Sequence, residues 1–175
     1  MNPNLESYNL SQADILIDMA KQVLYVPRLK KSYLVSTGLN GIGEQENSGK
    51  TPRGWHRIEQ KIGDDHPINA VFKARIWTGE IYDVELGEQF PERDWILTRI
   101  LWLAGLESGF NQGEGCDTYN RYIYIHGTPE SEPLGIPKSH GCIRMHSADV
   151  IELFDTLDEG ALVYISEQEI ELDQI

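Results

Sequence analysis

The residue types best suited to covalent chemistry gather between His126 and Arg144. The end of this stretch reads Ser139-His140-Gly141-Cys142-Ile143-Arg144, which places a cysteine beside a glycine, a histidine and an arginine. A thiol becomes a good nucleophile only as the thiolate, and a nearby imidazole or cation lowers its pKa. We therefore predict that Cys142 is a nucleophile and that His126 is its partner, provided that the loop between them folds back.

The neighbours of Cys142 predict a site that can hold an acyl group. Gly141 lets the backbone approach a substrate closely, and consecutive N–H groups around Cys142 could hold an oxyanion. Arg144 carries a fixed positive charge, which suits either a substrate carboxylate or a role in fixing the loop. His140 either lines the acyl site or holds the loop through a hydrogen bond. Ser139 completes the group of candidate oxyanion and substrate-binding residues.

A zinc site is the alternative use of these residue types. His126, His140, Cys142 and His146 could all be zinc ligands by type. Their spacing matches no familiar closed zinc site, so we predict neither a metal nor a cofactor. His146, which lies beyond the motif, is expected to be structural or exposed.

A short strand must present His126. The alternation from Tyr122 to Ile125 predicts this strand, with His126 at its end and a loop exit at residues 127–129. Tyr122 and Tyr124 share the side of the strand on which His126 lies, and both are expected to fill the core.

A helix follows the cysteine motif. Ile151, Phe154 and Leu157 recur at helical spacing, Ser147 is a plausible N-cap, and Gly160 fits a C-terminal cap. This is the one clear helix of the chain.

Strands dominate elsewhere. Residues 13–18 and 22–26 predict a hairpin, and further strands are expected at 31–36, 55–62, 161–165 and within 70–81 and 95–103. Residues 38–50 form a long glycine-rich surface loop, and the loops of 63–120 are expected to line the substrate cleft. His56 and His66 are expected at the surface.

Three ordered segments resemble the L,D-transpeptidases with a YkuD-type catalytic domain. They are His126-Gly127-Thr128-Pro129 followed by Leu134-Gly135 and the Ser139–Met145 motif, Thr51-Pro52-Arg53-Gly54-Trp55, and Val35-Ser36-Thr37-Gly38. The resemblance covers residues 15–165. It implies a mainly β fold, a mixed β-sheet sandwich or barrel-like domain with a helix beside the catalytic loop. It also implies an orienting contact for His126 at Gly127, where only the backbone carbonyl can serve.

The same resemblance implies an activity. A cysteine acyltransferase of this family cleaves the bond between residues 3 and 4 of a peptidoglycan stem tetrapeptide through a thioester, and passes the acyl group to an amine. An L,D-carboxypeptidase that uses water, or a non-catalytic module that binds cell-wall peptides, stays open as an alternative. The expected partners are donor and acceptor stem peptides, with a carbapenem adduct on the cysteine as a further expectation.

Composition limits the other partners. The 175 residues carry a formal net charge of −13, which argues against nucleic acid and anionic membranes. No apolar run is long enough for a membrane span, and we expect a monomer. The cysteines, Cys116 and Cys142, are expected to be free thiols, because pairing them would inactivate the nucleophile.

The chain is expected to form one domain at residues 13–166, between a flexible N-terminal segment, 1–12, and an acidic tail, 167–175. The N-terminus shows no secretory signal pattern. The family resemblance places the protein in the cell wall or periplasm, while the missing signal leaves a cytoplasmic location open.

Overall fold

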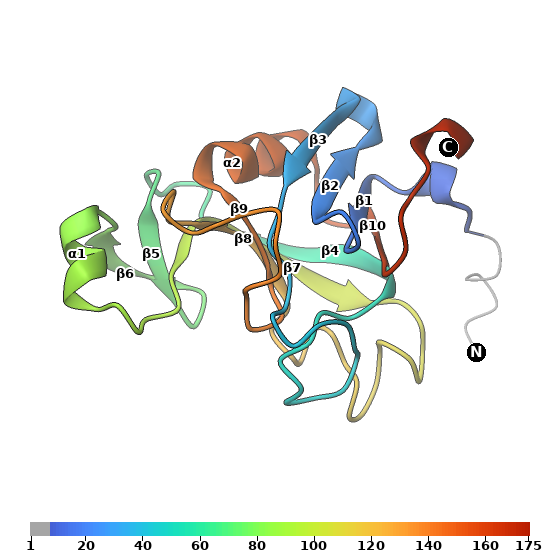
Figure 1. Ribbon diagram of the computed structural model, residues 1–175, viewed down its shortest axis with the longest axis horizontal. Helices are drawn as coiled ribbons and strands as arrows, with labels where there is room; N and C mark the ends of the chain where they lie inside the picture. The colour runs from blue at the N-terminus through green and yellow to red at the C-terminus, as the bar shows by residue number, and fades with distance from the viewer. Residues whose placement is uncertain (1–7) are drawn as a thin grey trace.

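The computed structural model describes residues 8–175 and is built around one large mixed sheet (Figure 1). Neighbouring strands along the main path follow the order β3-β2-β1-β10-β4-β7-β5-β6, and β8 and β9 branch from β7. The strands are β1 (Ile15–Asp18), β2 (Val23–Val26), β3 (Lys31–Leu34), β4 (Gly54–Ile62), β5 (Ala70–Lys73), β6 (Ile76–Ile81), β7 (Ile96–Gly105), β8 (Tyr124–Thr128), β9 (Ile143–His146) and β10 (Leu162–Ser166).

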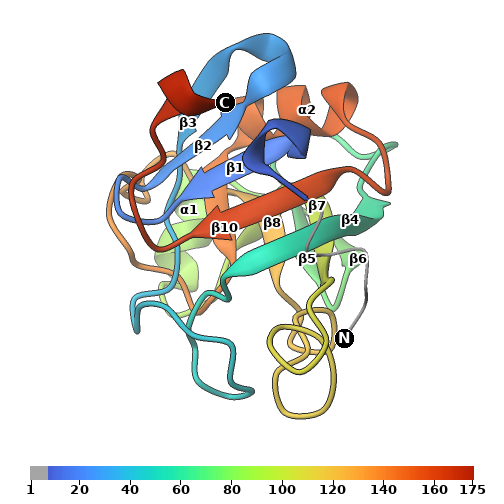
Figure 2. The ribbon, with the colours of Figure 1, turned by 90° about the vertical axis from the view of Figure 1, so that its right-hand side faces the viewer.

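The sheet curls until its two ends nearly meet. β7 pairs with β8 along one side, while β4 and β5 pair with different parts of its length on the other, since Leu97 lies between Val71 of β5 and Gly127 of β8. β9 lies parallel to β8, and an antiparallel bridge between Ser36 and Arg144 joins it to the segment that follows β3. The result is the mainly β, barrel-like fold that the sequence predicts (Figure 2).

The interior of this barrel is apolar. Alternate residues of the strands, among them Ile17, Leu103, Ile125 and Ile143, are fully buried in one cluster. Alternation is expected because successive side chains in a strand point to opposite faces. The opposite face of β8 and β9 is therefore available for the polar residues of the motif.

The predicted helix is α2 (Ser147–Thr156), which packs Val150, Leu153 and Phe154 into the same apolar cluster. Both predicted caps are wrong. The N-cap is His146, because the hydroxyl of Ser147 is bonded to Thr98 inside the protein. Gly160 lies beyond the helix end, in the turn before β10.

A second helix, α1 (Val84–Gln89), was not predicted. Asp83 caps its N-terminus by accepting a hydrogen bond from the Leu86 N–H. None of its six residues is buried, so it lacks the apolar periodicity by which helices are recognised in a sequence. Short 3₁₀ turns complete the structure: η2 (Leu10–Gln12), η3 (Pro27–Leu29) and η4 (Leu172–Gln174).

The expectation of a flexible segment at 1–12 falls partly on residues 1–7, which lie outside the described residues. Tyr8 contacts Trp55, and Asn9 forms a capping box with Gln12 at η2. The acidic tail is also attached to the domain, since Ile170 is buried and its N–H donates to Asp18.

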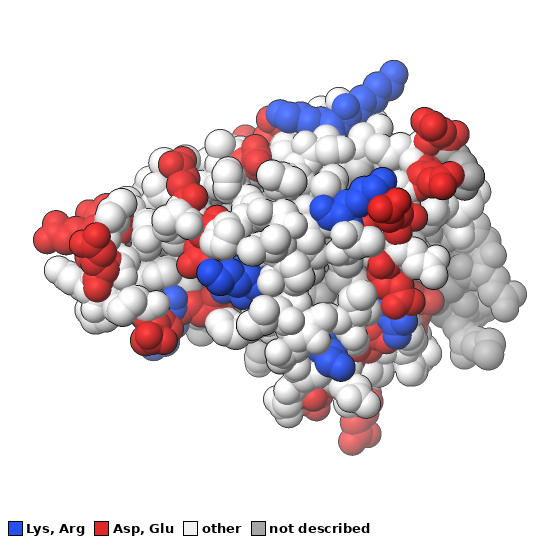
Figure 3. Space-filling model, in the orientation of Figure 1, with Lys and Arg blue, Asp and Glu red and all other residues white. Residues whose placement is uncertain are grey.

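Charge is distributed without a continuous basic patch on the face shown in Figure 3, where acidic and basic side chains are interspersed.

Among residues 8–175, no helix has the length and apolar character needed to cross a membrane.

Candidate active site

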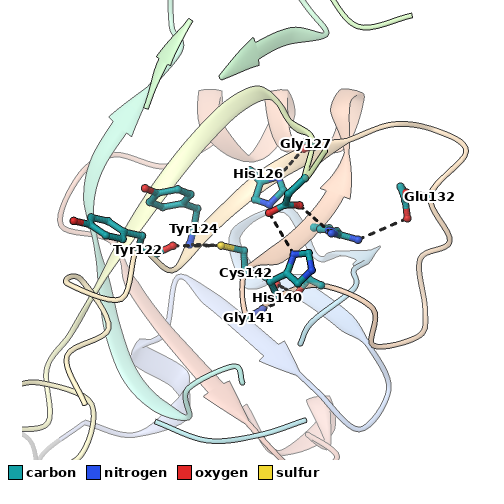
Figure 4. A network of polar contacts seen from close by, with 11 residues as sticks. Tyr122, Tyr124, His126, Gly127, Glu132, His140, Gly141 and Cys142 are labelled. Atoms are coloured by element: carbon teal, nitrogen blue, oxygen red, sulfur yellow. Dashed lines mark hydrogen bonds and ion pairs between the residues drawn. The ribbon is translucent and has the colours of Figure 1, made fainter. Parts of the chain in front are cut away.

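Cys142 and His126 lie on the same face of two adjacent strands. β8 and β9 run parallel, with Ile125 opposite Ile143 and His126 opposite Arg144. Cys142 immediately precedes β9, so it lies beside the start of β8, and the even-numbered residues of both strands share one face. The parallel pairing therefore places Cys142 beside Tyr124 and diagonally across from His126, and Figure 4 shows both side chains on the same side.

The strand that carries His126 begins later than predicted. β8 starts at Tyr124 and continues through Gly127 and Thr128, so His126 lies within the strand and residues 127–128 are not a loop exit. This difference matters for the site, because a histidine inside a strand is held by hydrogen bonds on both sides of the backbone. His126 is buried.

The proton on His126 can be assigned from its hydrogen bond. Nδ1 lies 2.7 Å from the carbonyl oxygen of Gly127, and a carbonyl can only accept, so Nδ1 carries hydrogen. The predicted orienting contact is confirmed. Burial lowers the pKa of His126, against the opposing effects of Asp94 and of this hydrogen bond. The imidazole is thus neutral near pH 7, and Nε2 is left as a proton acceptor.

Glycine is required at position 127 by close packing. A Cβ atom there would lie 2.5 Å from the carbonyl oxygen of Leu97 on β7 and 3.0 Å from the Ser147 hydroxyl. The backbone of β8 can therefore approach β7 only with glycine at this point. The same approach fixes the carbonyl that orients His126.

The Cys142 thiol is held by the backbone of the preceding turn and of β8. Its sulfur donates to the Tyr122 carbonyl at 3.3 Å and accepts from the Tyr124 N–H at 3.4 Å (Figure 4). Burial raises the pKa of the Cys142 thiol to about 12, although the Tyr124 N–H opposes that effect. A nearby imidazole or cation is expected to lower a thiol pKa, but at Cys142 desolvation outweighs the positive charges of Arg144 and Arg121.

The loop before Cys142 leaves two backbone donors free. Ser139 donates its hydroxyl to the Cys142 carbonyl and accepts from the Gly141 N–H, so that N–H is already occupied. Within residues 8–175, the N–H groups of His140 and Cys142 donate to no protein acceptor. These two groups, rather than that of Gly141, are available to an oxyanion.

Thr51 ties the three motif segments together. Its hydroxyl donates to the Gly141 carbonyl at 2.8 Å and accepts from the Gly38 N–H at 2.8 Å. Gly141 adopts a left-handed φ of 123°, which favours glycine at this turn. Hydrogen bonds thus join the three motif segments into one loop system.

Arg144 is engaged with the protein's own carboxylates. It bonds to Asp94 at 3.0 Å and lies 3.6 Å from Glu132, and its side chain is only 9% exposed. The arrangement matches the loop-fixing alternative. His140 is 78% exposed and reaches Asp94 at 3.5 Å, and that carboxylate is also close enough to His126 to raise its pKa.

Sequence reasoning missed Asp94. Burial raises the pKa of this carboxyl, but electrostatic interactions with His126, Arg144 and His140 together hold it below its usual range. Asp94 lies in the turn between α1 and β7, 32 residues before His126, and no local pattern distinguishes it from the other acidic residues of that region. Only the fold places it beside the motif.

One surface assignment and one core assignment need correction. His56 is fully buried, with Nδ1 donating to the Gly54 carbonyl and Nε2 accepting from the Thr118 hydroxyl. Tyr122 is 53% exposed rather than a core residue, because the strand begins two residues after it. Tyr124 is buried as predicted. Cys116 and Cys142 are both free thiols, as predicted.

The geometry defines a class of protein: a barrel-like β domain that presents a cysteine and a neutral histidine from adjacent parallel strands. Comparison with known proteins gives the family. The family model for the L,D-transpeptidase catalytic domain, YkuD, matches residues 12–165. The chain therefore belongs to this family.

The individual relatives match this chain over a short stretch or at low sequence identity. YqjB of Bacillus subtilis (strain 168), which bears a provisional name as an L,D-transpeptidase, is 40% identical over 58 residues, one third of each protein. Among solved structures, L,D-transpeptidase 3 from Mycobacterium tuberculosis with a faropenem-derived adduct is 16% identical, with a TM-score of 0.51 over 89% of this chain and 59% of that one. The transpeptidase LdtMt1 in complex with imipenem is 17% identical, with a TM-score of 0.51 over 87% of this chain and 57% of that one. The chain thus spans less than two thirds of their lengths, and these structures support the fold alone.

Proposed function

We propose that this protein is a cysteine acyltransferase, an L,D-transpeptidase, that acts on peptidoglycan stem peptides. The observation that carries the proposal is the placement of Cys142 and of a neutral His126, with Nε2 free to accept a proton, on one face of two paired strands. Family membership supports the choice of stem peptides as substrate.

The first half-reaction transfers the tripeptide acyl group, which ends in the third stem residue, to Cys142. The Cys142 proton passes to Nε2 of His126 as sulfur attacks the carbonyl of that residue. The N–H groups of His140 and Cys142 stabilise the oxyanion. The C–N bond to the fourth residue, D-alanine, then breaks, and its nitrogen leaves with the proton that His126 holds.

The resting pair is neutral, so substrate must trigger the proton transfer. A thiol with a pKa near 12 and a histidine with a lowered pKa do not form an ion pair by themselves. Asp94 stabilises the imidazolium once it forms, since its charge favours protonation of His126. Arg144 holds Asp94 in place.

The second half-reaction opens the thioester. An amine from a second stem, or from a protein to be anchored, attacks the thioester carbonyl, loses a proton to His126, and leaves Cys142 to recover that proton. Water as the acceptor would give an L,D-carboxypeptidase instead, and loss of turnover with retained peptide binding would define a binding module. The proposed location is the cell wall or periplasm, the proposed state is a monomer, and no cofactor takes part.

Intact mass spectrometry tests the proposal. Incubation with a tetrapeptide stem should add the mass of the tripeptide acyl group to the protein, and an added amine should remove it with formation of a cross-linked product. Cys142→Ala should abolish the adduct, whereas Cys116→Ser, which changes the other free thiol, should leave it intact. Turnover of the tetrapeptide by the Cys142→Ala protein would overturn the assignment of the nucleophile.

A further inference from the structure

The turn between β5 and β6 has an unusual composition. Lys73 pairs with Ile76, so the turn consists of Ala74 and Arg75 alone, with left-handed φ values of 48° and 66°. Two-residue turns with this backbone favour asparagine and glycine, because other residues are strained there. The chain therefore places a large cation at a position where its backbone conformation is unfavourable.

The side chain of Arg75 extends toward the aromatic residues that flank the cysteine. Its guanidinium lies 4.8 Å from the ring centroid of Trp102 and 4.9 Å from that of Tyr122, and it donates to the Tyr124 hydroxyl at 3.0 Å. Tyr122 and Tyr124 are the residues whose backbone groups bond the Cys142 thiol. Arg75 thus contacts the side chains of the same two tyrosines whose backbone groups hold the nucleophile.

The charge of Arg75 is uncompensated. In a chain with a net charge of −13, no carboxylate of residues 8–175 lies within ion-pair distance of it. By contrast, Arg53, Arg93 and Arg144 all pair with acidic side chains. Aromatic rings and a hydroxyl hold the guanidinium in position but leave most of its hydrogen-bond donors unused.

We propose that Arg75 determines specificity by binding a free side-chain carboxylate on the donor residue of the stem peptide. When the carbonyl of that residue lies at Cys142, a side chain of several carbon atoms can run along the exposed ring of Tyr122 and place its terminal carboxylate at the guanidinium. A planar guanidinium binds a carboxylate through two parallel hydrogen bonds. A peptide side chain that ends in an amide or an ammonium group cannot accept both of these bonds. This inference rests on the proposed transpeptidase function and adds to it a preference for the acidic form of the donor residue.

Paired peptides test the inference. One tetrapeptide stem carries a third residue with a free side-chain carboxylate, and the other carries the same residue with that group amidated. The wild-type protein should favour the acidic peptide by about tenfold in kcat/KM, and Arg75→Gln should reduce that ratio toward one by losing activity on the acidic peptide alone. Arg75→Lys should retain part of the preference. Arg57→Gln removes the same charge at an exposed site on β4 and should leave the ratio unchanged.

A second measurement separates recognition from chemistry. In a Cys142→Ala background, calorimetric binding of the acidic peptide should weaken about tenfold with Arg75→Gln, while binding of the amidated peptide stays the same. An unchanged acid-to-amide ratio in an active Arg75→Gln enzyme would overturn the role of Arg75 and leave the proposed function standing. Failure of the wild-type protein to act on either peptide would overturn the proposed function, and the role of Arg75 with it.

Discussion

His126 and Cys142 show how one environment acts on two ionisable groups in the same direction. Burial disfavours the charged form of each, so the histidine pKa falls and the thiol pKa rises. The pair therefore rests as neutral imidazole and thiol rather than as imidazolium and thiolate.

This resting state predicts slow alkylation. Because the pKa of Cys142 is raised to about 12, the thiolate fraction near pH 7 is very small, and iodoacetamide should modify Cys142 more slowly than Cys116 in the same protein. The rate at Cys142 should still be rising at pH 10. Peptide mapping by mass spectrometry over a pH series measures both rates, and a plateau for Cys142 below pH 8 would contradict the neutral pair.

A strained β-lactam can substitute for the peptide carbonyl. Attack by Cys142 on a carbapenem opens the four-membered ring and forms a thioester, with the thiol proton passing through His126 to the ring nitrogen. We expect a stable adduct of one drug molecule per chain by intact mass, and a much less stable one with ordinary penicillins. The Cys142→Ala protein is the control. No adduct with the wild-type protein at high drug concentration would contradict an accessible acylation site.

At the scale of elements, an irregular stretch of β7 sets the position of the histidine strand. The register between β7 and β8 shifts between Leu97 and Ile100, where Thr98 adopts a left-handed φ of 75°. The Thr98 hydroxyl bonds to the Ser147 hydroxyl at 2.6 Å and accepts from the Asn69 N–H at 3.0 Å. The bulge thereby joins β7 to the start of α2, beside Gly127.

Gly127→Ala tests this contact. The added methyl group would meet the backbone oxygen of Leu97 at 2.5 Å, so β8 must move away from β7, and the carbonyl that orients His126 must move with it. We expect a loss of about 1–3 kcal/mol in the free energy of unfolding and a larger loss of activity than of stability.

Gly43→Ala provides a matched control for that substitution. Its methyl group would meet only the Lys50 side chain, at 2.7 Å, which can rotate away. Urea unfolding and turnover of the stem peptide should both stay close to wild type. Equal losses in the two variants would show that the effect at position 127 is not specific to the β7–β8 contact.

At the scale of the whole molecule, His56 couples folding to pH. It is fully buried on β4, and burial lowers its pKa to about 4, against the opposing Gly54 carbonyl and Glu44, while Arg121 lowers it further. In the unfolded chain the pKa returns to about 6.5. Between these values the unfolded state binds more protons, so stability falls as the pH drops from 6.5 toward 4.

The size of this effect can be predicted. From pH 7 to pH 5 the free energy of unfolding should fall by about 2 kcal/mol through His56. Buried His126 contributes in the same direction, because its pKa is also lowered. Urea unfolding at the two pH values measures the change, and His56→Gln should have a pH dependence smaller by that amount, whatever its stability at pH 7. An unchanged dependence in the variant would exclude His56 as the source.

The sequence by itself determined what depends on local order. The Ser139–Arg144 motif identified the candidate nucleophile and its loop, the β-forming residues of 13–18 and 22–26 predicted the β1–β2 hairpin, and the spacing of Phe154 and Leu157 predicted α2. The family resemblance implied an orienting contact for His126 at Gly127, and the absence of a side chain there left only the carbonyl to make it.

Only the tertiary structure decided the charges of the site and its distant members. Asp94 and Arg75 are far from the motif in the chain, and neither has a local signal, since their roles arise from a turn and a hairpin that fold beside β8. Burial of His56 follows from the pairing of β4 with β10 and β7, which a single strand pattern does not specify. The raised pKa of Cys142 has the same origin. A neighbouring histidine is visible in the sequence, but the loss of water around the thiol depends on how the strands pack, and here that loss is the larger effect.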